Sequence, residues 1–124
     1  MLDGILQAAL RGGRVMGLDV RIIQRRKILC PNCGEVVCQK DIECADSGGR
    51  AWYDILESFG YYVPYERRTE QNDWYSKDMI LSEAQATQMR KFVTSNDVYN
   101  GKTIANLIAA AKCDGDDVVL NADW

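Results

Sequence analysis

The chain has 124 residues, of which 47% are hydrophobic and 27% charged, the proportions of one ordinary globular domain rather than of a disordered chain. It has no histidine, which excludes Ser-His-Asp and Cys-His catalytic systems and histidine-ligated zinc. The net charge of −3 is uneven: six basic and two acidic side chains give +4 in residues 1–30, and nine basic and sixteen acidic ones give −7 in residues 31–124.

Residues 1–15 are expected to be an N-terminal extension or a short helix, because the run LDGILQAAL ends before a Gly-Gly pair. This segment lacks the basic start of a signal peptide, and no apolar run approaches the roughly 20 residues that a bilayer requires. We therefore expect no membrane association and a cytoplasmic location. Residues 16–124 are expected to form a single α+β domain.

The first element in that domain is a predicted β-hairpin over residues 18–44. Leu18, Val20 and Ile22 alternate with polar residues, which is the period of a strand with one buried face. The sequence CPNCG at residues 30–34 has turn chemistry, and the residues that follow it favour a returning strand.

Three helices and a final strand follow the hairpin. The cluster DSGG at residues 46–49 is a candidate helix start, and free amides there, with Arg50, could hold an anion. Ser82 and Gln85 have the spacing of a capping box. The apolar stripes that predict the helices are Trp52, Ile55, Leu56 and Phe59; Ala86, Met89, Phe92 and Val93; and Ile104, Leu107, Ile108 and Ala111, with a strand over residues 118–121 after them.

Cys30 and Cys33, in the sequence CPNCG, have the spacing of a zinc knuckle, a turn that presents two thiolates to one metal ion. Structural zinc takes four ligands, and the nearest further candidates are Cys38 and Cys44. A regular strand would place these two on one side of the sheet but roughly 20 Å apart, so a four-cysteine site requires a sharp bend between residues 34 and 44. The alternatives are a turn without metal, a redox C-x-x-C pair, or a metal shared with a second chain.

Eight of the eleven aromatic residues lie between residues 52 and 75, interleaved with arginines. Such a segment can stack on single-stranded nucleic acid or form a protein-binding hot spot. The surrounding acidic residues favour a protein partner. The predicted partner contacts are Tyr61, Tyr62, Tyr65, Arg67 and Trp74.

Two further sets of charged residues define alternative functions. A nucleic-acid-binding protein would use the basic residues of the hairpin to contact phosphates. An enzyme would have to rely on carboxylates such as Asp41, Glu43 and Asp46, which could bind magnesium if they cluster; Asp41 and Glu43 are expected on one face of a strand. The basic residues of the hairpin that would contact phosphates are Arg21, Arg25, Arg26 and Lys27.

The chain resembles a family of short uncharacterised proteins of phages and prophages of gut bacteria. The resemblance covers residues 16–124 and is carried by MGLD, CPNCG, DSGGRAWYDILESFGYYVPYE, RTEQNDWY and the terminal VVLNADW. The chain departs from the family pattern at Ser76, where the family has glycine. The resemblance implies the context of a mobile genetic element, in which a small protein often inhibits a host system such as CRISPR-Cas.

The main hypothesis is a non-enzymatic protein-binding module that inhibits a complex of the bacterial host. The alternative is a zinc-knuckle protein that binds nucleic acid. Two further hypotheses are an enzyme and a purely structural or oligomeric role. The oligomeric state is left open.

Overall fold

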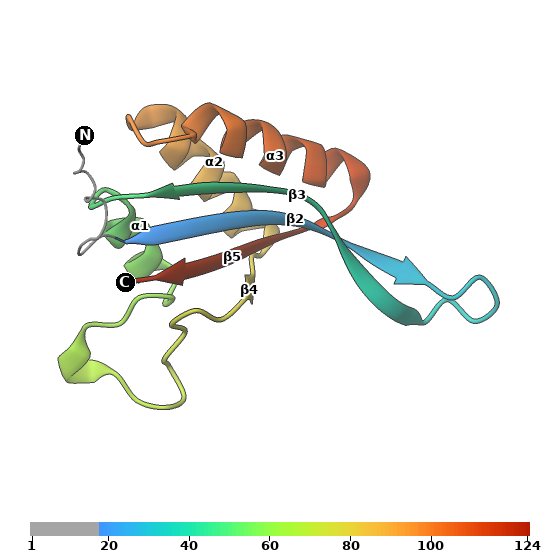
Figure 1. Cartoon of the computed structure of the whole chain (residues 1–124), viewed down its shortest axis with the longest axis horizontal. Helices are drawn as coiled ribbons and strands as arrows, with labels where there is room; N and C mark the ends of the chain where they lie inside the picture. Colours follow the sequence, from blue (N-terminus) through green and yellow to red (C-terminus); the bar gives the residue numbers. More distant parts are fainter. Residues whose placement is uncertain (1–17) are drawn as a thin grey trace, which may run out of the picture.

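A computed structural model describes residues 18–124; the predicted extension at residues 1–15 lies outside them. Four strands form an antiparallel sheet in the order β3-β2-β5-β4, and the helices pack on one face of it (Figure 1). This confirms the predicted α+β class and the N-terminal hairpin. The elements are β2 (Asp19–Leu29), β3 (Val36–Gly48), α1 (Trp52–Ser58), a 3-10 turn (Tyr65–Arg67), β4 (Met79–Ile80), α2 (Glu83–Ser95), α3 (Gly101–Asp114) and β5 (Asp117–Asp123).

The hairpin follows from the alternation of its residues. Leu18, Val20 and Ile22 are almost completely buried against the helices, while Asp19 and Arg21 on the other face are exposed. β2 is paired with β3 on one side and with β5 on the other. It is therefore an interior strand that hydrogen bonds to a neighbour on each side.

The start of α1 differs from the prediction. Residues 46–48 continue β3, and the helix begins at Trp52 without a side-chain cap. Ser47 is buried. Its hydroxyl donates to the Tyr99 carbonyl oxygen at 2.6 Å and accepts from Trp52 Nε1 at 3.0 Å, so the buried polar group has hydrogen-bond partners. The expected helix start at residues 46–48 is therefore wrong: Ser47 belongs to β3 and joins the sheet to the helical layer.

The other two helices are close to the prediction. The capping box of Ser82 and Gln85 is present, with both reciprocal hydrogen bonds. Ser82 is the N-cap, and α2 starts at Glu83. α3 buries the predicted stripe and ends at Gly115, whose positive φ of 74° is readily adopted by glycine. The core therefore lies between this helical layer and the inner face of the sheet.

β4 was not predicted, because two residues show no periodicity. Its pairing with Leu120 and Val119 of β5 completes the sheet. Between residues 18 and 124, no helix is both long and apolar enough to cross a bilayer.

Candidate functional site

The hairpin continues beyond the rest of the sheet. β5 pairs with β2 only from Asp19 to Arg25, whereas β3 follows β2 to Leu29. Residues 26–40, which we call the arm, therefore form a two-stranded ribbon that projects from the body (Figure 1). A β-bulge at Ile42 lies where the arm leaves the sheet, and bulges increase the local twist of a ribbon.

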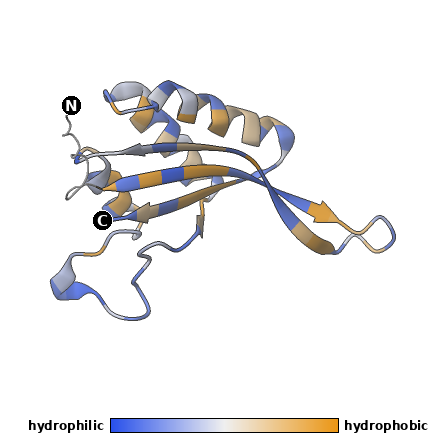
Figure 2. Cartoon of the chain, viewed as in Figure 1, coloured by the Kyte–Doolittle hydropathy of each residue, from blue (hydrophilic) through white to orange (hydrophobic). Residues whose placement is uncertain are grey.

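The arm carries large apolar side chains in exposed positions. Leu29 is 54% exposed, Val36 50% and Val37 62%. Leu29 and Val36 are cross-strand partners, and Val37 is the extra residue of a second irregularity. Figure 2 shows hydrophobic colour on both strands of the arm beside its tip. Exposed apolar side chains gathered on one projecting element are typical of a protein-binding surface.

The tip of the arm has the backbone arrangement of a knuckle. The Gly34 amide donates to the Cys30 carbonyl oxygen at 2.9 Å, and the Cys30 amide donates to the Glu35 carbonyl oxygen at 2.7 Å. Gly34 has a positive φ of 76°. Hydrogen bonds from the backbone amides of Asn32 and Cys33, and one from the Cys33 thiol, lower the pKa of the Cys30 thiol. The turn thus lowers the cost of forming a thiolate at Cys30.

The structure does not bring four cysteines together. Cys38 is opposite Ile28 and Cys44 is opposite Ile23, so they lie on opposite faces of the sheet. The expectation that Cys38 and Cys44 share a side is wrong, because the bulge at Ile42 changes the alternation between them. Within residues 18–124, no three cysteine or carboxylate side chains converge closely enough to hold a metal. Zinc at the tip stays a prediction.

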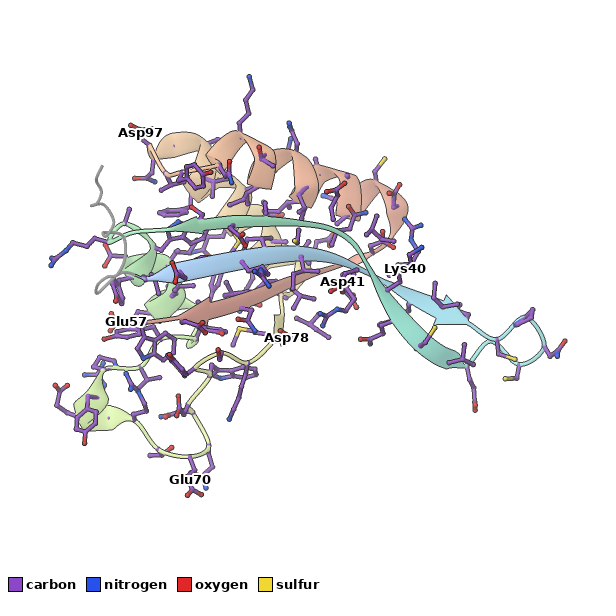
Figure 3. All side chains as sticks on the ribbon, in the orientation of Figure 1. Lys40, Asp41, Glu57, Glu70, Asp78 and Asp97 are labelled. Carbon is purple, nitrogen blue, oxygen red and sulfur yellow. The ribbon has the colours of Figure 1, made fainter. Side chains whose placement is uncertain are left out.

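The basic residues of the hairpin are engaged with carboxylates of the same chain. Arg25 Nε lies 2.7 Å from Asp41 Oδ1, and its Nη1 lies 2.9 Å from Asp78 Oδ2. Only 17% of the Arg25 side chain is exposed. Figure 3 places Asp41 at the base of the arm with Asp78 nearby on the body. Arg21 is likewise paired with Asp46, at 3.0 Å.

Arg26 makes the corresponding contacts on the helical face. Its Nη2 lies 2.9 Å from Asp116 Oδ2, and the buried Gln24 amide donates to the same oxygen at 2.7 Å. The hydrogen bond from Arg26 lowers the pKa of Asp116. Lys27 lies 3.7 Å from Asp117. Arg26 and Lys27 are therefore paired with the acidic turn after α3, which weakens the case for phosphate binding by these two residues.

Tyr61 is not the exposed partner contact that the sequence suggested. It is completely buried, and its hydroxyl donates to the Lys77 carbonyl oxygen and accepts from the Ala122 amide, each at 2.7 Å. Burial raises the pKa of Tyr61 to about 12. The side chain fastens the 61–78 loop to β5.

The other aromatic residues of this segment are also used internally. The ring of Trp124 packs edge-on against Tyr62 at 5.1 Å and Tyr75 at 5.1 Å, and the Arg68 guanidinium lies over it at 5.3 Å. Trp74 is half-buried against the core. The assignment of Tyr62 and Trp74 as free contacts is therefore corrected: Tyr62 packs against the C-terminal Trp124, and Trp74 lies beside the buried Tyr61.

Two of the five predicted contacts are exposed. Tyr65 is 83% exposed, and the Arg67 side chain is 66% exposed, with Glu57 3.5 Å from its guanidinium. Both belong to the 3-10 turn of the loop. They remain available to a partner, but two side chains on a loop offer less surface than the arm.

The carboxylates considered for magnesium do not cluster. The bulge places Asp41 and Glu43 on opposite faces, because Asp41 is opposite Arg25 and Glu43 is opposite Gln24. The expectation that they share a face is wrong. Asp46 pairs with Arg21 instead.

A cleft of about 360 Å³ lies between α2, α3 and the start of β5. Its lining mixes Arg90 and Lys112 with Glu83, Asp116 and Asp117. Asp116 is already bonded to Arg26 and Gln24, and Lys112 lies 3.9 Å from Glu83.

Sequence reasoning missed the apolar residues of the arm. The available signal was the pair of short apolar runs on either side of the tip, Ile28-Leu29 and Val36-Val37-Cys38. Both runs lie beyond Arg25, the last residue of β2 that pairs with β5. The sequence does not show where β5 ends, so it does not show that these runs stay exposed.

No protein-family model, curated protein or solved structure matches this chain, so the resemblance to phage proteins stays a prediction.

Proposed function

We propose that the chain is a non-enzymatic protein-binding module that engages its partner through the arm. The observation that carries this proposal is the exposure of Leu29, Val36 and Val37 on a ribbon that projects from the body. A two-stranded ribbon outside a sheet has little stability of its own. Contact with a partner would bury its apolar side chains and its unpaired strand edge.

The partner surface is an apolar patch with room for a β-ribbon. Burying three aliphatic side chains that are about half exposed contributes a few kcal/mol, at roughly 25 cal/mol per Å². The open edge of β2 beyond Arg25 adds backbone hydrogen bonds if the partner supplies a strand. The resemblance to phage proteins suggests a bacterial host protein as this partner, with inhibition of a defence complex as the consequence.

The nucleic-acid alternative has less support. Arg21, Arg25 and Arg26 each hydrogen bond to a carboxylate, so a phosphate would have to displace an internal partner. The net charge of −3 of the whole chain also disfavours binding to nucleic acid.

The proposal is tested by affinity capture from lysates of candidate bacterial hosts. The bait is the full chain, compared with the double variant Val36→Lys/Val37→Lys. Both positions are exposed, so the double variant is expected to fold, which circular dichroism verifies. Loss of a specific partner in the double variant, followed by reconstitution with that purified partner, supports the arm as the interface.

Two control variants distinguish the surfaces. Tyr99→Ser changes an aromatic residue that is 72% exposed in the segment between α2 and α3, and should leave capture unchanged. Tyr65→Ser tests the aromatic loop. Capture that depends on Tyr65 but not on the arm would overturn the proposal, as would the absence of any specific partner.

A further inference from the structure

We propose that the arm tip is half of a zinc site, and that two copies of the chain complete it with Cys30 and Cys33 from each. The site would be a tetrahedral four-thiolate centre on a two-fold axis at the ends of two arms. This inference does not rest on the proposed function, because the purified chain alone tests it.

The first argument is the preformed geometry of the two ligands. The Gly34 amide donates to the Cys30 carbonyl oxygen at 2.9 Å and the Cys30 amide donates to the Glu35 carbonyl oxygen at 2.7 Å, so backbone hydrogen bonds close the turn that carries both cysteines. A metal with bonds of about 2.3 Å to sulfur holds its tetrahedral ligands about 3.8 Å apart. Two neighbouring thiols on a tight turn therefore need little rearrangement to bind one metal ion.

The second argument is the position of the remaining cysteines. Cys44 is far along the sheet opposite Ile23, and Cys113 is near the end of α3. Cys38 is nearest, but it is held in the strand opposite Ile28 and does not join the pair at the tip. Residues 1–17 contain neither cysteine nor histidine. A four-thiolate site centred on the tip thus takes its second pair from another chain.

The third argument is access. Residues 31–40 are all exposed, and the arm holds the tip away from the body (Figure 1). Two tips can therefore meet without contact between the bodies. The tip residues from Pro31 to Gly34 include no lysine, arginine, aspartate or glutamate, and the nearest acidic side chain is Glu35. A two-fold arrangement makes each tip the partner of an identical tip, which is the commonest symmetry of protein dimers.

The experiment is a metal titration of the reduced full chain with zinc, and with cobalt as a spectroscopic probe. Molar mass is followed by light scattering during size-exclusion chromatography. We expect saturation at about one metal ion per two chains, with a cobalt spectrum typical of four thiolates. The mass should rise from 14.0 kDa to twice that value, and a chelator should reverse the change.

Matched cysteine variants assign the ligands. Cys30→Ser and Cys33→Ser should abolish both metal binding and dimerisation, with an unchanged circular dichroism spectrum because the tip lies outside the core. Cys38→Ser and Cys113→Ser should behave as the wild-type chain. Saturation at one metal ion per monomer with loss in Cys38→Ser would replace the shared site by a closed one. Absence of binding, or a dimer that persists in chelator, would also overturn the inference.

Discussion

The hydroxyl group of Tyr61 hydrogen bonds to both the 61–78 loop and β5. Its removal in Tyr61→Phe tests whether these bonds hold the loop to the sheet. Phenylalanine at this position keeps the ring, which lies 6.1 Å from Trp74 and 5.9 Å from Trp124 between centroids. It removes the bond donated to the Lys77 carbonyl oxygen and leaves the Ala122 amide without its acceptor.

The magnitude follows from these two bonds. Loss of the bond to Lys77 costs about 1 kcal/mol, and an unsatisfied buried amide costs about 1–3 kcal/mol, so Tyr61→Phe should lower the free energy of unfolding by about 2–4 kcal/mol. For a chain of this size, that corresponds to a decrease in melting temperature of roughly 10 °C. Urea unfolding followed by circular dichroism should show a lower midpoint with an unchanged slope.

The neighbouring residue is a matched control. Tyr62 is half-buried, and its ring packs on Tyr53 and Trp124; within the described part of the chain its hydroxyl has no hydrogen-bond partner. Tyr62→Phe should change stability by less than about 0.5 kcal/mol. If both variants melt with the wild-type chain, the hydroxyl of Tyr61 does not hold the loop, and the reasoning is wrong.

The same hydroxyl predicts a dependence on alkaline pH. Its pKa is raised from 10.0 to about 12 by burial, so the folded chain favours the neutral phenol. This contribution is complete below pH 10.0 and is lost as pH rises towards about 12. Tyr61→Phe should lack this part of the alkaline transition.

Three other variants probe the base of the arm and the sheet. Because hydrogen bonding to Arg26 lowers the Asp116 pKa below 3.8, the contribution of Asp116 to stability should be present above that pH and lost as pH falls below it; acid titration of Asp116→Asn should show a shallower loss. Arg25→Ala should cost about 1–2 kcal/mol, because it leaves two carboxylates without their shared cation, as thermal unfolding can measure. Gly48→Ala should destabilise the sheet strongly, because the new methyl group would lie 2.2 Å from the Leu18 carbonyl oxygen.

Each of these three variants has a comparison that could contradict it. Lys27→Ala removes a more exposed and more distant cation and should have a smaller effect than Arg25→Ala. Gly34→Ala strains a positive φ at the tip but meets no atom within 4 Å, so it should perturb the core less than Gly48→Ala. An acid profile of Asp116→Asn identical to that of the wild-type chain would contradict the contribution assigned to Arg26.

Local patterns in the sequence determined most of the elements. The alternation from Leu18, the stripe from Trp52 to Phe59 and the capping box at Ser82 each depend on residues a few positions apart. Their physical causes, such as one buried face or a satisfied helix end, act within a single element. The CPNCG turn was predictable for the same reason.

Only the tertiary structure decided how the charges and the aromatic residues are used. The basic hairpin and the acidic turn after α3 are about 90 residues apart, yet Arg26 bonds to Asp116 because β5 lies beside β2. Tyr61 is buried because the last strand supplies partners for its hydroxyl. The bulge at Ile42 places Cys38 and Cys44 on opposite faces of the sheet. Because β5 pairs with β2 only as far as Arg25, the arm has no neighbouring strand from the body. Each of these outcomes depends on strand register and on contacts between distant segments, to which a local sequence pattern is not sensitive.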